Sequence, residues 1–394
     1  MNRILSTLAV AVVFVASGAV VPTAGRATAS TPHCCTPWRV APAPDPSGRA
    51  ELTDVASFST GGAWAVGFTV ADICCSATIA LHEHAGTWTQ VPTPNPAPLS
   101  NQLFAVAGSA DDDVWAVGSG SDNGGDTART LIEHWDGVSW RVVPSPSPRN
   151  RSDTLFGVSV RSRTDAWAVG DVENVATNTG VTLIEHWDGR RWSIVPSPNA
   201  DKANTLEAVS ASSPNDAWAT GVSSRSSGLN GHNLALHWDG SEWERIDVPN
   251  PGVVDDALES ILAVSRDDAW AVGYATDAAA STRTPITLRW DGSQWSLVAN
   301  PPLFGQLTAV AAARGRAVWA AGYREDPTTT LIERWDGSAW RIVPSANPPR
   351  SPSNLLLGIA VGARTNSYWA VGADYFPSTR DHTLIEHPVG WATS

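Results

Sequence analysis

The chain has 394 residues, with 26 basic and 39 acidic side chains and a formal net charge of −13. This acidic balance argues against a nucleic acid or an anionic membrane as the partner, because both require a basic face that neutralises phosphates. The 20 Trp, 28 Pro and 32 Gly favour strands and turns over helices.

The N-terminus has the pattern of a secretory signal. After the start MNR, residues 4–21 form an apolar run, and residues 27–29 read Ala-Thr-Ala, the small-x-small sequence that signal peptidases cleave. We predict that residues 1–29 are a signal peptide, that cleavage follows Ala29, and that the protein is secreted. A membrane anchor is the alternative for this run. No later segment is apolar enough to span a bilayer, so we expect no membrane span in the mature form.

The rest of the chain is repetitive. The motif W-A-x-G occurs seven times at intervals of 49 to 52 residues, beginning at Trp64, Trp115, Trp167, Trp218, Trp270, Trp319 and Trp369. Each copy belongs to a unit with four short strand-like runs, which in the second unit are LFAVAGSA, VWAVG, TLIEHW and WRVVP. Four strands per unit at this period predict an all-β fold, a seven-bladed β-propeller of four-stranded antiparallel blades. We assign residues 30–394 to this single domain.

The order of marks within a unit resembles the kelch repeat of galactose-oxidase-like propellers. In the second unit these marks are Gly118 closing an apolar strand, then Trp135-Asp136, Trp140 and Pro144. The pattern departs from kelch in having one Gly where kelch units carry two. The WD repeat and the sialidase Asp-box are weaker comparisons. The period is too long for a WD repeat, and the Asp-box requires Asp-x-Gly, whereas Asp and Gly are adjacent in this chain. The resemblance implies a fold and no activity, since kelch-like propellers include oxidases, epimerases and binding scaffolds.

The stretch TLIEHWDGVSW, residues 130–140, looks catalytic because it carries Glu133, His134 and Asp136. Neighbouring strand residues point to opposite faces, so Glu133 and His134 cannot act on one substrate atom. The same triplet recurs in the third unit, which would place several identical sites around a ring. We therefore interpret the stretch as a strand and hairpin, with Asp136 in the turn and the two flanking tryptophans facing each other.

Both ends of the domain share features. The segment PWRV from Pro37 matches the fourth run of the other units, so we predict that a strand near Trp38 closes the last blade. Four cysteines stand nearby as two adjacent pairs, and an exported chain favours disulfides between them. The connectivity stays open, because the two pairs are expected on opposite faces of the ring. A metal site is the alternative, although adjacent cysteines lack zinc-ligand spacing. The cysteines are Cys34, Cys35, Cys74 and Cys75.

The seven units differ most in the segments expected to join their second and third strands. Three of the four tyrosines of the chain fall in these loops of blades 5 to 7, together with charged residues. Tyrosine rings beside Arg and Asp suit the apolar faces and hydroxyls of sugars; solvated polar loops are the plainer alternative. The candidate ligand-binding residues are Tyr274, Tyr323, Arg324, Asp326, Tyr375, Arg380 and His382.

The function that follows is an exported binding or interaction propeller, with carbohydrate as the leading ligand. The alternative is an extracellular sugar-active enzyme (a lyase, epimerase or hydrolase) on the same loop face, and a structural role in the cell envelope is a third. The sequence carries no established catalytic motif, so we predict no cofactor and no metal. The expected partner is a glycan or a component of the cell envelope, and the expected state is a monomer.

Overall fold

The computed structural model describes residues 36–46, 48–59, 61–72, 75–122, 127–148, 151–174, 176–177, 179–225, 231–277, 282–312, 317–349, 351–362, 367–376 and 381–389. These residues contain 28 strands and no helix. Within them there is therefore no helix of the length and apolarity needed to cross a bilayer. The predicted signal peptide at residues 1–29 lies outside the described part.

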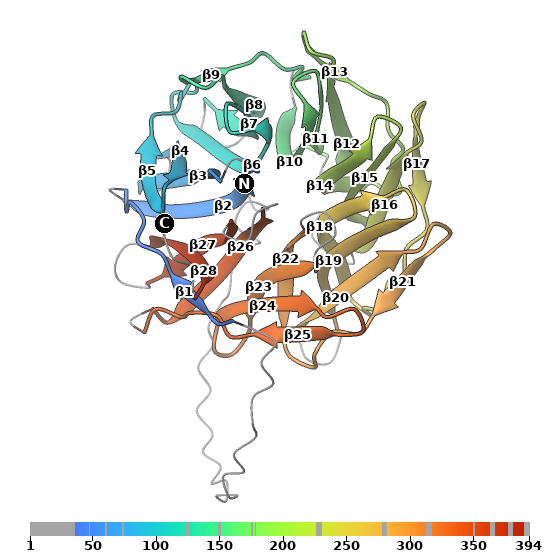
Figure 1. Ribbon diagram of the computed structural model, residues 1–394. Helices are drawn as coiled ribbons and strands as arrows, with labels where there is room; N and C mark the ends of the chain where they lie inside the picture. The colour runs from blue at the N-terminus through green and yellow to red at the C-terminus, as the bar shows by residue number, and fades with distance from the viewer. Residues whose placement is uncertain are drawn as a thin grey trace, which may run out of the picture.

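The strands form five sheets of four strands and one of eight. The eight-stranded sheet consists of two four-stranded units that touch through a single parallel pair, Ser76 with Ser100. Every other pairing is antiparallel, and within each four-stranded unit the strands pair in chain order, except that β1 pairs with β28. Figure 1 shows the sheets arranged around a centre, with the first strand of each unit innermost. We number the four-stranded units 1 to 7 in chain order.

The innermost strands are β2 (Arg49–Ser57), β6 (Ser100–Ala110), β10 (Ser152–Ser162), β14 (Ala203–Ser213), β18 (Asp255–Ser265), β22 (Gly305–Ala311) and β26 (Ser353–Val361). The second strands are β3 (Ala63–Asp72), β7 (Asp113–Ser121), β11 (Asp165–Asn174), β15 (Asp216–Ser224), β19 (Asp268–Thr276), β23 (Trp319–Arg324) and β27 (Tyr368–Tyr375). The third strands are β4 (Cys75–His84), β8 (Ala128–Trp135), β12 (Thr179–Trp187), β16 (His232–Trp238), β20 (Arg283–Trp290), β24 (Thr329–Trp335) and β28 (His382–Pro388). The outer strands are β5 (Thr87–Val91), β9 (Trp140–Val142), β13 (Trp192–Ile194), β17 (Trp243–Ile246), β21 (Trp295–Val298), β25 (Trp340–Val343) and β1 (Trp38–Val40).

The W-A-x-G motif lies in the second strand, which is covered on both faces. Its glycine allows a close approach that no other residue permits. At Gly118 a Cβ atom would lie 1.9 Å from the backbone oxygen of Gln102 in the neighbouring strand. The same clash, at 1.9 to 2.1 Å, would occur at the equivalent glycine of every other unit. The repeat therefore keeps glycine where two strands meet backbone to backbone.

Tryptophans join each unit to the next. Trp64 of unit 1 packs against Trp135 and Trp140 of unit 2, with ring centroids 4.8 and 5.1 Å apart. Trp135 and Trp140 are themselves directly opposite each other in β8 and β9, as predicted for the hairpin. Equivalent clusters centre on Trp115, Trp167, Trp218 and Trp270. Each cluster buries large aromatic area between two sheets, so the core is divided among the interfaces of the units.

The two ends of the chain share unit 7. Strand β1 pairs with β28, with Trp38 opposite Pro388, and the two strands lie together in Figure 1. The ring of Trp38 lies 5.8 Å from that of Trp319 in unit 6, so it takes the place of an outer-strand tryptophan. Thr383 donates a hydrogen bond to the oxygen of Pro44 beyond the strand. The N-terminal segment thus supplies the fourth strand of the last sheet.

Candidate functional site

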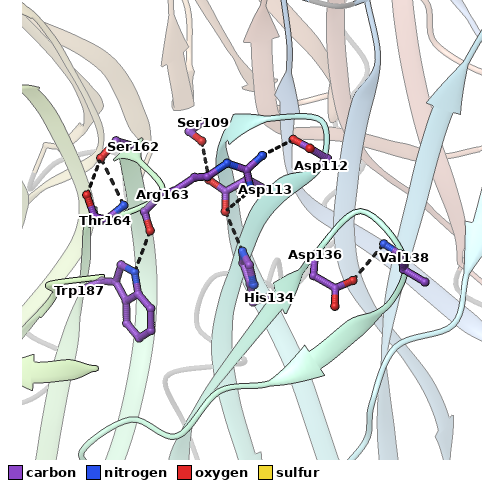
Figure 2. Close-up of polar contacts among 10 residues, drawn as sticks. All are labelled: Ser109, Asp112, Asp113, His134, Asp136, Val138, Ser162, Arg163, Thr164 and Trp187. Carbon is purple, nitrogen blue, oxygen red and sulfur yellow. Dashed lines mark hydrogen bonds and ion pairs between the residues drawn. The ribbon is translucent and has the colours of Figure 1, made fainter. Parts of the chain in front are cut away.

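The Glu-His-Asp stretch of unit 2 is part of the scaffold. His134 Nε2 lies 2.8 Å from Asp113 Oδ1, as Figure 2 shows. The His134 ring also packs on Trp115, with ring centroids 4.2 Å apart. Asp136 accepts hydrogen bonds from two backbone N–H groups of its own turn at 2.9 and 3.0 Å. Glu133 is fully buried and faces away from the histidine. The three side chains have three separate roles, which confirms the structural interpretation.

The same arrangement recurs in other units. His186 pairs with Asp165 and His237 with Asp216, at 2.9 and 2.8 Å. In unit 5 an arginine replaces the histidine, and Arg289 Nε lies 2.9 Å from Asp268 Oδ1. Arg163 of unit 3 also donates to Asp112 of unit 2 at 2.7 Å, a contact drawn in Figure 2. These contacts are spread over the turns of several units, so they fix sheet geometry and do not form one reactive centre.

A different set of polar groups converges between units 5 and 6. The guanidinium carbon of Arg283 lies 4.2 Å from the ring centre of Tyr274. The same guanidinium donates to Gln306 Oε1 and, at 3.5 Å, to Tyr323 Oη. Tyr274 Oη donates to Asp255 Oδ2 at 3.2 Å. We call Tyr274, Arg283, Gln306 and Tyr323, together with Glu259, the arginine cluster.

Burial and neighbouring charges shift the pKa values of the ionisable groups in the arginine cluster. Glu259 is half-buried, and burial raises its pKa although Arg283 lowers it. Burial opposes ionisation of Arg283, but the neighbouring tyrosines and carboxyl groups offset this and raise its pKa. Burial raises the pKa of Tyr323 to about 12, so its phenol stays protonated and can donate. The cluster therefore brings together one cation, one carboxyl group and neutral hydroxyls.

A second polar contact joins units 7 and 1. Tyr375 Oη donates to Glu51 Oε2 at 2.8 Å, and Arg49 Nε lies 2.6 Å from Asp381 Oδ2. Burial raises the pKa of Glu51 to about 7, in spite of the hydrogen bond from Tyr375. A carboxyl group with this pKa exchanges its proton near neutrality, which a general acid or base requires.

The predicted location of the tyrosines was wrong. Tyr274 and Tyr323 lie within β19 and β23, and Tyr375 is the last residue of β27, because the strand ladders extend beyond the W-A-x-G motif. Tyr274 and Tyr323 are 8% and 2% exposed, so neither is an open rim residue. Tyr323 contacts Arg283 of the neighbouring unit, and Tyr274 contacts Asp255 and Arg283 of its own unit, so neither ring stands on a loop surface.

The other predicted site residues do not join one group. Arg324 follows Tyr323 but faces the opposite side of the strand. Burial there raises the pKa of Glu333 to about 7, and the charge of Arg324 offsets only part of this rise. Asp326 is exposed. His382 Nδ1 lies 2.6 Å from Asp45 Oδ2 in the closing segment. Arg380 lies outside the described residues.

The predicted cysteine pairs are almost entirely outside the described part of the chain. Only Cys75 is described, at the start of β4, so the disulfides stay a prediction. In the described ranges no three His, Cys, Asp or Glu side chains gather as a metal site requires.

Sequence reasoning missed Arg283, Glu259, Gln306 and Glu51. A partial signal was present for Glu259, because the residue after the inner-strand Leu is Phe in units 2 and 3 but Glu in both unit 4 and unit 5, as Glu207 and Glu259. A charged residue in that register, next to the centre of the ring, marks a departure from simple packing. No comparable signal distinguished Arg283 from the other arginines.

Comparisons with solved structures identify the architecture. The chain is similar to YCF48 from Cyanidioschyzon merolae, with TM-score 0.51 and 16% identity over 89% of this chain and 99% of that one. It is also similar to a protein of unknown function from Dyadobacter fermentans DSM 18053, with TM-score 0.51 and 11% identity over 90% and 98% of the two chains. The fold is a β-propeller. At these identities the likeness shows the fold alone. No protein-family model matches the chain, and no curated protein matches it.

Proposed function

We propose that this propeller binds a polyhydroxylated ligand, with carbohydrate as the leading class, through the arginine cluster. The observation that carries the proposal is the convergence of Arg283 on Gln306 and Tyr323 of the next unit. A guanidinium, a carboxyl group and neutral phenols together supply donors and acceptors for several hydroxyls. The ligand would be held by polar contacts, because Arg283 already covers the face of Tyr274 on which a sugar ring would stack.

A glycan array tests this proposal with three forms of the mature protein. We expect the wild type to retain a defined set of cell-wall glycans and Arg283→Met to lose them. Arg289→Met is the matched control, because Arg289 lies in the same strand and also covers an aromatic ring, that of Trp270. It should bind like the wild type. Absence of glycan binding by the wild type, or equal loss in both variants, would contradict the proposal.

The second candidate is a sugar-active enzyme, and the observation that favours it is the pair formed by Glu51 and Tyr375. The carboxyl group of Glu51 has a pKa of about 7 and accepts a hydrogen bond from the phenol. Such a pair can pass a proton to or from a substrate oxygen. Reducing-end assays on soluble cell-wall polysaccharides test this. Glu51→Gln should abolish turnover and leave glycan retention unchanged if the pair is catalytic.

We further infer seven kelch-like blades in one ring, export of the chain with cleavage after Ala29, and disulfides among the four cysteines. The repeat count, the seven numbered units and the N-terminal sequence support this inference. Intact mass of the protein recovered from culture medium, with and without reductant and alkylation, tests the cleavage and the disulfides together. A chain that retains residues 1–29 would contradict export by this route.

A further inference from the structure

In most units, the segment that follows the outer strand is held to the third strand by a repeated set of side-chain contacts. In unit 3, the N–H of Thr182 donates to Asn199 Oδ1, and Thr182 Oγ1 lies 2.8 Å from Ser197 Oγ. We call this pairing of a third-strand residue with the segment after the outer strand the exit clip. Related contacts occur in units 1, 2, 4, 6 and 7, at Thr78, Thr130, Asn233, Thr330 and Thr383.

Unit 5, whose third strand and exit are described throughout, departs from the exit clip. The clip position lies opposite the residue four places after the W-A-x-G tryptophan, and in unit 5 that position is Pro285. Proline has neither an N–H nor a hydroxyl. Asn300, at the position of Ser197, donates instead to Thr287 Oγ1 at 3.0 Å and to Glu333 Oε2 of unit 6 at 2.9 Å. The exit segment is thus held to the neighbouring unit.

A groove opens at the altered clip. Its volume is about 480 Å³, and it is lined by residues 251–253, 275–277, 284–286 and 297–300. A second hollow of about 390 Å³ continues it along residues 300–304. Both contain Thr284, Pro285 and Asn300. The two hollows therefore meet at the positions that form the clip in the other units.

The walls of the groove are largely apolar. Val253 is 75% exposed and Leu297 is 52% exposed, and Phe304 at the far end is 55% exposed. Among the described residues of the lining, Asp277 is the one with an ionisable side chain. Exposed apolar side chains gathered along one depression are typical of an interaction site. The acid in the lining and the net charge of −13 favour a partner that carries positive charge.

We propose that this groove binds an extended segment of a protein partner, in which apolar side chains fill the groove and neighbouring Lys or Arg residues face Asp277. A second copy of the chain is the poorer occupant, because it carries the same negative charge. Pairing of the peptide as an added strand does not fit, since Pro285 removes a donor from the strand edge. The peptide is held by side-chain insertion, and the site is separate from the arginine cluster.

Fluorescence anisotropy with labelled peptides tests this inference on the full mature chain. The first peptide is Lys-Lys-Leu-Pro-Leu-Pro-Leu-Lys-Lys; a second replaces each Lys by Glu, and a third replaces each Leu by Ser. We expect the first to bind and both others to bind at least about tenfold more weakly, since charge and apolar contacts are each required.

Two sets of variants locate the binding. Leu297→Ser should weaken the first peptide about tenfold, which corresponds to about 1.4 kcal/mol. Ile194→Ser is the matched control, because Ile194 occupies the same outer-strand position in unit 3 and is 46% exposed. The double variant Pro285→Thr with Asn300→Ser restores the clip residues and should also weaken binding.

Equal binding by Leu297→Ser and Ile194→Ser, or equal binding of the Lys and Glu peptides, would overturn the proposal. Self-association of the wild type that Leu297→Ser abolishes would overturn it in favour of a second copy. Arg283→Met should keep wild-type peptide affinity, so loss of glycan binding and loss of peptide binding are measured separately.

Discussion

The buried glutamate of the third strand makes the stability of the ring depend on pH. Glu133 is fully buried, and neither of its carboxylate oxygens has a hydrogen-bond partner among the described residues. Burial raises its pKa from 4.5 to about 8. Between pH 4.5 and pH 8 the folded state holds a proton that the unfolded state releases. The free energy of unfolding is therefore highest below pH 4.5 and falls as the pH rises to 8.

Substitution of Glu133 by Gln removes this titration. The raised pKa corresponds to a cost of about 5 kcal/mol above pH 8 and about 3 kcal/mol at pH 7, at 1.36 kcal/mol for each pKa unit. We expect Glu133→Gln to match the wild type near pH 4.5 and to be more stable at pH 8. Leu is a second substitution that the fold itself supports, because Leu236 and Leu288 occupy the same position in units 4 and 5.

Urea unfolding followed by tryptophan fluorescence at pH 5, 6, 7 and 8 measures this difference. Glu242→Gln is the control, because Glu242 is exposed in a hairpin turn, and it should follow the wild-type curve at every pH. A constant difference between Glu133→Gln and the wild type across this range would refute the reasoning, since it would mean that Glu133 does not titrate differently in the folded state.

Three further substitutions test the scaffold. Trp38→Ala should lower the free energy of unfolding by about 3 to 5 kcal/mol, because a buried ring of the closing strand is lost; urea unfolding checks this, and a wild-type midpoint would mean that β1 does not close the ring. Gly118→Ala should lower the melting temperature or prevent folding through the 1.9 Å clash with a backbone oxygen, whereas Gly180→Ala, with no atom nearer than 3.5 Å, should melt like the wild type. Asp113→Ala should cost about 1 to 3 kcal/mol, because His134 loses its acceptor, and unchanged calorimetric stability would argue against a structural role for this pair.

The sequence was sufficient to predict the scaffold because seven copies report the same packing. The spacing of Trp135 and Trp140 predicted a hairpin with facing rings, and both features are present. A single copy would not have been enough, since Glu133, His134 and Asp136 alone resemble an active site. Repetition distinguishes the structural from the catalytic interpretation, because a packing position recurs from unit to unit whereas an enzyme needs its reactive centre only once.

The site was less predictable, because alternation along a strand indicates two faces without saying what each face meets. Tyr323 and Arg324 are neighbours in sequence, yet Tyr323 accepts a hydrogen bond from Arg283, whereas Arg324 interacts electrostatically with Glu333. In a ring of sheets each face of a strand touches a different unit. Grouping residues by loop therefore combined side chains that the fold separates, and it overlooked Arg283, which reaches from unit 5 into unit 6.

The departures of unit 5 lie at the end of the sheet away from the tryptophan clusters. Trp218 and Trp270 still form their clusters on either side of this unit, so its interfaces at the turn end match those of its neighbours. At the opposite end, Arg283 and Pro285 replace the ordinary residues of the third strand. The start of the third strand therefore differs from that of the other units while the tryptophan clusters are kept. The arginine cluster and the groove both begin there, which is why one unit is the best place to look for both ligands.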